Sequence, residues 1–230
     1  MARVALISAD GDAQADLAGV LEAADLACWV LRGAEEAGRV FGRETFDVIL
    51  IHGRGDDGAA SDLVRQVRLG PAAAAPLLVI APSASQDDIA AILEAGADDC
   101  LDATPSPAVL VARVRAALRR AAPAGDLRKV WRVGDFEIDP AQRAIRLDGR
   151  DIALTRMEFA LAELLFANVG RPLSRAYALE AVWGRNPDVP TRTLDTHVSR
   201  IRNKLGLTPA NGARLSTVYS YGYQLDLLKG

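Results

Sequence analysis

The chain contains little of what builds metal centres or disulfide frameworks, since its 230 residues include only two cysteines and two histidines. Cys28 and Cys100 lie far apart in apolar segments, which favours two buried thiols over a disulfide or a metal site. No apolar run approaches the ~20 residues that a membrane-spanning helix needs. The first residues also become acidic too early for a signal peptide. These absences predict a cytoplasmic protein.

Signatures of catalysis are also missing. The sequence has no recognisable Ser/His/Asp set for nucleophilic catalysis and no cluster of metal ligands. The glycines in Gly53-Arg54-Gly55 lack the spacing and context of a phosphate-binding loop. We therefore expect neither an enzyme nor a bound cofactor.

The formal net charge of -3 is unevenly distributed along the chain. Residues 1–122 hold 11 Lys and Arg against 18 Asp and Glu, a net charge of -7. Residues 123–230 hold 16 against 12, a net charge of +4. This asymmetry is compatible with a C-terminal half that binds nucleic acid and an N-terminal half that does not.

Short apolar runs alternate with amphipathic segments in the first half of the chain. The runs are continuous, as in the central strands of a parallel sheet that helices cover on both faces. We therefore predict a doubly wound, five-stranded α/β domain over residues 1–121, followed by a linker over residues 122–129. The expected strands are 4–7, 27–31, 48–51, 77–80 and 100–101.

From residue 130 the pattern changes to short, partly alternating strands followed by three helical segments. Thr155 is positioned to cap the first helix, with Glu158 completing a capping box. The second helix is expected to begin near Ser174 and the third after Pro190, and two strands around Tyr221 close the chain. A small sheet, three helices and a terminal hairpin predict a winged helix-turn-helix over residues 130–230.

The third of these helices, about residues 192–205, has an apolar stripe on one face and polar side chains on the other. In a major groove Arg reads guanine, Asn reads adenine and Thr touches the thymine methyl group, while flanking cations hold phosphates. By itself the pattern is more typical of a solvated surface helix. The surrounding sequence instead favours a DNA-binding helix. The candidate DNA contacts on this helix are Arg192, Thr196, His197, Ser199, Arg200, Arg202, Asn203 and Lys204.

Segments 154–161, 170–175, 182–184, 192–205 and 216–223 resemble the effector domain of OmpR/PhoB-type response regulators. The resemblance implies a winged helix that binds double-stranded DNA, a loop near 183–189 that meets RNA polymerase, and a wing near 217–223 that enters the minor groove. It adds Thr217 and Tyr219 as candidate DNA contacts in the wing. Tyr219 stands where family members usually have arginine, which departs from the family's cationic contact.

The same resemblance extends over residues 3–121, chiefly through segments 94–99 and 110–115, and implies a CheY-like receiver domain. Receivers phosphorylate an aspartate with the help of a Mg²⁺-binding acidic pair, a hydroxyl group and a lysine. At these five positions the chain has Ser8 and Ala9, His52, Ala81 and Ala103. We therefore expect a degenerate receiver that is not phosphorylated on aspartate and binds no metal. Nearby Asp10, Asp56 and Asp57 are interpreted as solvated loop carboxylates, and His52 as a packing or hydrogen-bonding residue.

Phosphorylation drives dimerisation in the family, so a receiver that cannot be phosphorylated is expected to form a constitutive homodimer. Asp99 and Arg113 match one ion pair that family members form across the dimer, whereas apolar Ile89 and Val109 occupy the positions of another. Apolar replacement can be neutral or stabilising, because no charge has to be desolvated. The alternative is that Ile89 packs inside the monomer. The predicted interface comprises Ile89, Leu93, Asp99, Val109, Val111 and Arg113.

Two functions remain open at this point. The chain is either a phosphorylation-independent transcription regulator, or a regulator whose receiver is a ligand- or protein-binding module that controls DNA binding. In the second case Ser8, Asp10, His52 and Ala81 would line a vestigial pocket that small side chains have opened.

Overall fold

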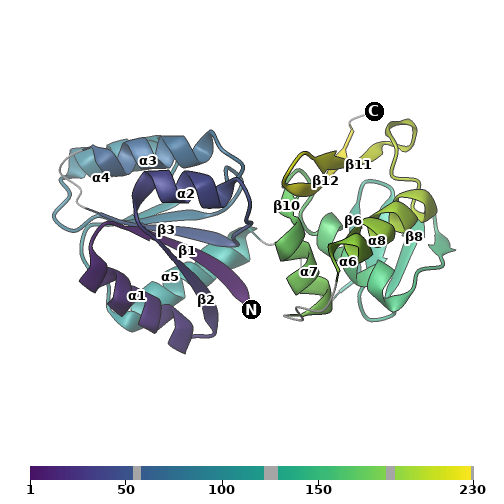
Figure 1. Ribbon diagram of the computed structural model, residues 1–230, viewed down its shortest axis with the longest axis horizontal. Helices are drawn as coiled ribbons and strands as arrows, with labels where there is room; N and C mark the ends of the chain where they lie inside the picture. Colours follow the sequence, from purple (N-terminus) through teal and green to yellow (C-terminus); the bar gives the residue numbers. More distant parts are fainter. Residues whose placement is uncertain (54–57, 122–128, 185–189, 229–230) are drawn as a thin grey trace. The chain divides into compact units, whose positions relative to one another are not determined.

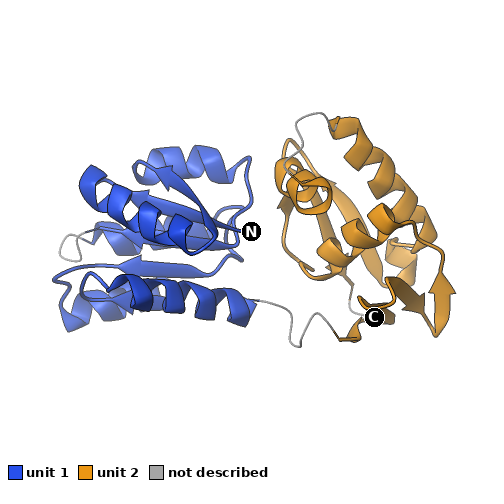
Figure 2. Ribbon diagram, turned by 90° about the horizontal axis from the view of Figure 1, so that it is seen from below, with its two compact units in different colours: residues 1–121 blue, residues 122–230 orange. Residues whose placement is uncertain are grey.

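The computed structural model describes residues 1–53, 58–121, 129–184 and 190–228. The chain divides into two compact units, Met1–Ala121 and Ala122–Gly230 (Figure 2). Asp56, Asp57, most of the expected linker and most of the loop expected at 183–189 lie outside the described residues.

The first unit is a five-stranded parallel sheet in the order β2-β1-β3-β4-β5, with helices on both faces. Figure 1 shows α1 and α5 on one face of the sheet and α2, α3 and α4 on the other. The strands are β1 (Ala2–Ser8), β2 (Leu26–Leu31), β3 (Val48–His52), β4 (Leu77–Ile80) and β5 (Asp99–Leu101). The helices are α1 (Gly11–Ala23), α2 (Gly33–Phe41), α3 (Ala59–Arg68), α4 (Gln86–Glu94) and α5 (Pro107–Ala121).

The continuous apolar runs of the sequence exist because both faces of this sheet are buried. In β1, Val4 and Leu6 pack toward α1 and α5, whereas Ala5 and Ile7 pack toward the opposite helix layer. Successive side chains of a strand point to opposite faces, so a strand covered on both sides needs apolar residues at every position. The predicted doubly wound fold is confirmed.

The two cysteines lie on different strands, Cys28 on β2 and Cys100 on β5, at opposite edges of the sheet. Both are free and half-buried, which corrects the expectation of fully buried thiols. Burial raises the pKa of Cys28 to about 12 and also raises the pKa of Cys100. Neither thiol is therefore activated as a thiolate.

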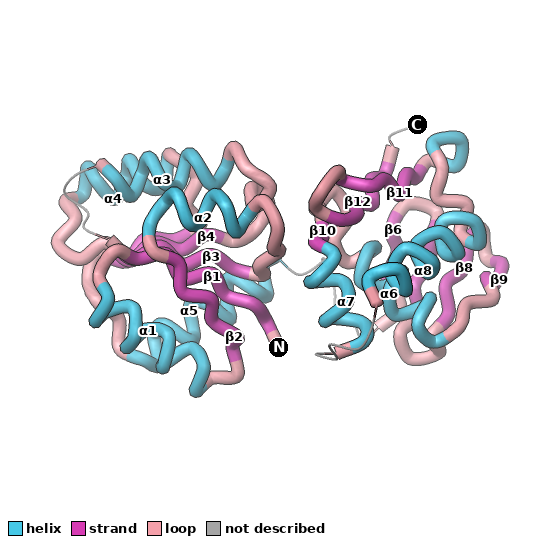
Figure 3. Tube along the Cα trace, in the orientation of Figure 1, coloured by secondary structure: helices cyan, strands magenta, loops and turns pink. Residues whose placement is uncertain are grey.

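The second unit begins with a four-stranded antiparallel sheet and continues with three helices and a three-stranded sheet, traced in Figure 3. The first sheet contains β6 (Trp131–Val133), β7 (Phe136–Asp139), β8 (Ala144–Leu147) and β9 (Arg150–Ile152). The helices are α6 (Arg156–Phe166), α7 (Arg175–Trp183) and α8 (Thr191–Lys204). The second sheet, in the order β10-β12-β11, contains β10 (Leu173–Ser174), β11 (Ala213–Val218) and β12 (Gly222–Leu227).

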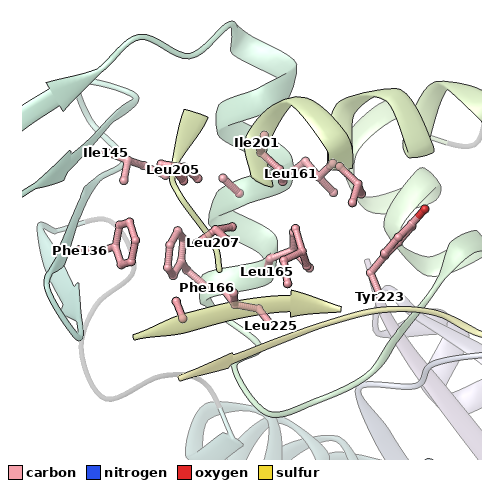
Figure 4. Close-up of a cluster of buried hydrophobic side chains, with 14 of the residues drawn as sticks. Phe136, Ile145, Leu161, Leu165, Phe166, Ile201, Leu205, Leu207, Tyr223 and Leu225 are labelled. Carbon is pink, nitrogen blue, oxygen red and sulfur yellow. The ribbon is translucent and has the colours of Figure 1, made fainter. Parts of the chain in front are cut away.

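One apolar core joins all parts of the second unit. Figure 4 shows side chains from α6, α8 and both sheets meeting in this core, among them Phe136, Leu165, Ile201 and Leu225. The helix starts agree with the sequence prediction, because Thr155 and Glu158 form a reciprocal capping box and Ser174 caps α7. The predicted winged helix-turn-helix is confirmed. None of the described helices is both long enough and apolar enough to cross a bilayer.

Gly222 explains how β12 can lie against the short strand β10, which the sequence pattern did not reveal. Gly222 pairs with Ser174, and a Cβ atom at Gly222 would collide with the backbone carbonyl of Leu173. Only glycine permits this close approach of two backbones. The third strand of the small sheet therefore depends on a single residue type at this position.

Candidate nucleic-acid interface and receiver site

Helix α8 is fixed by an apolar stripe and presents a polar face to solvent. Leu194, Val198 and Ile201 are almost completely buried in the core of the second unit. On the opposite face the side chains are exposed, as expected from 100° of rotation per residue. The exposed candidates on this face are Arg192, Thr196, Ser199 and Asn203, and Arg200 and Lys204 are exposed beside it.

Two of the candidate phosphate contacts, Arg202 and Lys204, already bind partners inside the second unit. Arg202 Nε donates to the carbonyl oxygen of Leu215 on β11 at 3.0 Å. Lys204 Nζ donates to Glu158 Oε2 at 2.7 Å. These bonds hold the end of α8 against β11 and α6, a role that the amphipathic pattern of α8 did not indicate.

The partner of Lys204 is a buried carboxylate at the start of α6. The side chain of Glu158 is 2% exposed and also accepts a hydrogen bond from the backbone N–H of Thr155 at 2.8 Å. Burial raises the pKa of Glu158, but the hydrogen bonds from Lys204 and Thr155 outweigh it, so the net effect lowers the pKa. The ionised carboxylate therefore joins the capping box of α6 to the last turn of α8.

His197 is half-buried and packs against α7. Its ring meets that of Trp183 edge to face, with centroids 5.1 Å apart. His197 Nδ1 lies 2.8 Å from the carbonyl oxygen of Thr193. Because a carbonyl oxygen only accepts, Nδ1 is the donor of this bond. Three of the eight candidates on α8 therefore contact other parts of the unit: His197, Arg202 and Lys204.

Asp195 is a positioning residue that the sequence analysis missed. Its Oδ1 accepts from the guanidinium of Arg175 on α7 and from the hydroxyl of Tyr223 on β12. One carboxylate therefore ties α8 to both neighbouring elements. The available signal was an acidic residue on a helix whose other charged side chains are all cationic.

The hairpin of β11 and β12 forms the wing. Thr217 is exposed, and the side chain of Tyr219 at the turn is 94% exposed. Ser220 has a φ of 56°, which lets the turn close between Val218 and Gly222. The turn thus holds both wing candidates, Thr217 and Tyr219, in solvent.

In the first unit the five degenerate receiver positions meet at the carboxyl edge of the sheet. Ser8 and His52 end β1 and β3 and are direct neighbours in the strand register. Ala9 follows β1, Ala81 follows β4, and Ala103 follows β5. Sequence reasoning thus identified positions that the fold brings to one edge.

A hydrogen bond joins the two polar side chains at this edge. His52 Nδ1 and Ser8 Oγ are hydrogen-bonded at 3.1 Å, and Ser8 Oγ accepts a second bond from the backbone N–H of Asp10, also at 3.1 Å. Burial lowers the pKa of His52, and the charge of Asp10 opposes this shift without cancelling it. The hydrogen-bonding role expected for His52 is therefore what its contacts show.

The residues at this edge do not fit Mg²⁺. A hard cation prefers several anionic oxygens, whereas the acidic-pair and nucleophile positions carry a hydroxyl, a methyl group and an imidazole. The carboxylate of Asp10 caps α1 by accepting from the N–H groups of Asp12 and Ala13. Over the parts of the chain that the structure describes, no three His, Cys, Asp or Glu side chains are grouped to hold a metal ion.

The residues of the expected dimer interface lie on α4, β5 and α5. Leu93 and Val109 are 43% and 45% exposed, which is high for large apolar side chains, whereas Ile89 and Val111 are half-buried. Asp99 and Arg113 form an ion pair within the same chain, with Arg113 Nη1 2.9 Å from Asp99 Oδ2. The pair that was expected to cross a dimer is thus already satisfied inside one subunit.

Comparison with known proteins gives a consistent set of relatives. The family model "Transcriptional regulatory protein, C terminal" matches residues 149–225. The sensory transduction protein RegX3 of Mycolicibacterium smegmatis is 33% identical over 225 residues, which cover 96% of this chain and 98% of RegX3. The phosphate regulon transcriptional regulatory protein PhoB of Pseudomonas aeruginosa is 29% identical over 211 residues and 91% of each chain. The solved structure of DrrB, an OmpR/PhoB homologue from Thermotoga maritima, is 23% identical and covers 100% of both chains with a TM-score of 0.44.

Proposed function

The chain belongs to the OmpR/PhoB-type response regulators, and from this premise we propose that it is a sequence-specific transcription regulator that binds duplex DNA without being phosphorylated on aspartate. The observation that carries the proposal is the outer face of α8. The exposed side chains of Arg192, Thr196, Ser199 and Asn203, which can donate or accept hydrogen bonds, lie opposite the buried stripe, and Arg200 is exposed beside them.

The proposed division of labour on α8 follows from its contacts. Arg192, Arg200 and Asn203 have exposed side chains suited to base edges and phosphates in a major groove. Arg202, Lys204 and His197 hold the helix in place through Leu215, Glu158 and Trp183, with any DNA contact as a second role. Thr217 and Tyr219 extend the interface into the wing.

Phosphorylation independence rests on the chemistry of the receiver edge. Phosphoryl transfer to aspartate needs a carboxylate nucleophile and compensation of the phosphoryl charge. The edge instead presents His52 bonded to Ser8, with alanine at the hydroxyl and lysine positions. We propose that the first unit serves assembly, as a constitutive homodimer through the exposed apolar side chains Leu93 and Val109.

A dimer would bring two copies of α8 to two half-sites spaced about one helical turn apart. RNA polymerase is the proposed protein partner, on the strength of the family alone. The second half of the loop expected to meet it, residues 185–189, is outside the described residues.

Selection of bound duplexes from a randomised pool tests the proposal. The purified chain should enrich a repeated motif, and its affinity should fall steeply as salt rises, because phosphate contacts release counterions. The variants Arg200→Ala and Asn203→Ala should lose affinity for the selected duplex. Arg150→Ala, an exposed arginine on β9, is the matched control and should not. Absence of any salt-sensitive affinity would refute the proposed function.

A further inference from the structure

A cavity of about 770 Å³ opens at the carboxyl edge of the parallel sheet, where the receiver positions meet. Its volume is within the range of pockets that hold metabolite-sized molecules, ~300–1,000 Å³. The strand order reverses between β1 and β3, and ligands of doubly wound sheets bind at such a reversal. Ser8, Asp10 and His52 line the cavity, as the second hypothesis from the sequence expected, whereas Ala81, which was also expected there, is fully buried and does not.

The lining is mainly apolar and made of small side chains. Ala9, Ala13 and Ala34 line the cavity from the loop after β1 and from α1 and α2, and Leu63 and Pro82 add larger apolar surface. Small residues leave the space open, because the longer acidic side chain that receivers carry at the position of Ala9 would project toward the cavity. The cavity therefore suits a ligand with an apolar body.

The charges around the cavity select against anions. Among its described lining residues there is no lysine or arginine, and the only charged group is the carboxylate of Asp10. The described wall therefore offers a phosphate or sulfonate no cation, and this carboxylate repels it. The ligand class that fits the described wall is uncharged.

The polar groups supply one anchor. His52 is half-buried at the cavity, and its Nδ1 is engaged with Ser8 Oγ. The other ring nitrogen, Nε2, has no hydrogen bond to any described residue. Thr104 adds a hydroxyl to the lining. A few convergent polar groups in a mostly apolar wall are typical of a site that orients a small molecule.

We propose that this cavity binds an uncharged, largely apolar small molecule that carries at least one hydrogen-bonding group, which His52 contacts. The site is built entirely within the first unit and does not depend on whether the second unit binds DNA. Its test therefore succeeds or fails independently of the proposed function.

The test titrates the full-length chain with Nile red, an uncharged apolar dye that fluoresces in apolar surroundings. Its carbonyl oxygen accepts from Nε2–H of the His52 tautomer in which Ser8 Oγ donates to Nδ1. We expect saturable binding of one dye per chain. The variants Ala34→Trp and Ala9→Phe fill the cavity from two different elements. Both positions are exposed, so neither variant overfills the buried core. Each should weaken binding at least tenfold, whereas Ala15→Phe, an exposed alanine of α1 outside the lining, should change it less than twofold.

Two further measurements test the chemistry of the site. His52→Phe keeps a planar ring but removes the hydrogen bond, and should weaken Nile red about five- to tenfold, as expected for the loss of one hydrogen bond of roughly 1 kcal/mol. The anionic dye 1-anilinonaphthalene-8-sulfonate should not compete with Nile red. Circular dichroism of every variant should match that of the unmodified chain.

Three results would overturn the proposal. They are no saturable binding by the unmodified chain, binding that Ala34→Trp and Ala9→Phe leave intact, and binding that Leu93→Lys abolishes while the cavity variants do not. The last outcome would place the dye on the exposed apolar face of α4 and α5. Equal affinity for the anionic dye in competition with Nile red would refute the uncharged ligand class.

Discussion

Replacing Lys204 by methionine should destabilise the second unit, and the loss should depend on pH. Lys204 Nζ lies 2.7 Å from Glu158 Oε2, and the Glu158 side chain is 2% exposed, whereas that of Lys204 is 39% exposed. A hydrogen bond to a charged group contributes about 1.5–3 kcal/mol. Partial exposure of Lys204 weakens the ion pair. Removing Lys204, however, also leaves the buried carboxylate of Glu158 without its cation. We therefore expect Lys204→Met to lower the free energy of unfolding by about 2 kcal/mol at pH 7.

The direction of the pH dependence follows from the pKa of Glu158, which the folded structure lowers below its ordinary value of 4.5. A lowered pKa contributes stability that is present above the ordinary value and is lost as the pH falls through the folded value. In Lys204→Met the hydrogen bond from Lys204 no longer opposes the effect of burial on Glu158. The pKa of Glu158 is therefore higher in this variant than in the unmodified chain. The difference in stability between the two proteins should therefore be largest at pH 7 and should narrow as the pH falls below 4.5 and through the lowered pKa of Glu158.

Urea unfolding followed by tryptophan fluorescence measures this difference. In a Trp29→Phe background the remaining tryptophans, Trp131 and Trp183, both report on the second unit. Lys129→Met, which removes an exposed lysine before β6, is the matched control and should change stability by less than about 0.5 kcal/mol. An equal loss at pH 7 and pH 4 would show that Lys204 acts through packing. No loss at either pH would refute the ion pair.

Other consequences can be measured on the same protein. Arg192→Ala and Arg200→Ala should each reduce the slope of log affinity against log salt by about 1 if the arginine binds a phosphate; an unchanged slope would exclude a phosphate contact by that arginine. Incubation with a radiolabelled phosphodonor should leave the chain unlabelled; stable label would contradict the proposed independence from phosphorylation, and loss of that label in His52→Ala would place it on His52. Sedimentation at tens of micromolar should show a dimer, which Leu93→Lys converts to a monomer by placing a charge in the apolar contact; a monomeric unmodified chain would end the constitutive-dimer proposal. Asp195→Asn should weaken DNA binding severalfold without reducing the salt slope, because Asp195 positions α8 through Arg175 and Tyr223 and touches no phosphate; a lower slope would contradict this role.

Local patterns in the sequence predicted most of the fold because their physical causes are local. Continuous apolar runs indicated strands that are buried on both faces, and the pair Thr155 and Glu158, three residues apart, indicated where α6 begins. The stripe of Leu194, Val198 and Ile201 indicated which face of α8 is buried. The strand β10 escaped prediction because it has two residues, and its pairing depends on Gly222, far along the chain.

The features of the candidate sites also divide into those that the sequence predicted and those that only the folded structure revealed. Residue types alone determined that α8 carries cationic and amide side chains and that the receiver edge lacks its carboxylates and lysine. Only the tertiary structure decided that Lys204 binds Glu158, 46 residues earlier, and that Asp99 pairs with Arg113 inside one chain. It also decided the size and the lining of the pocket beside His52, which the sequence had raised only as an alternative. The reason is physical, since hydrogen bonds, ion pairs and cavities depend on distances between atoms that the chain brings together only on folding, whereas periodicity and capping act between near neighbours.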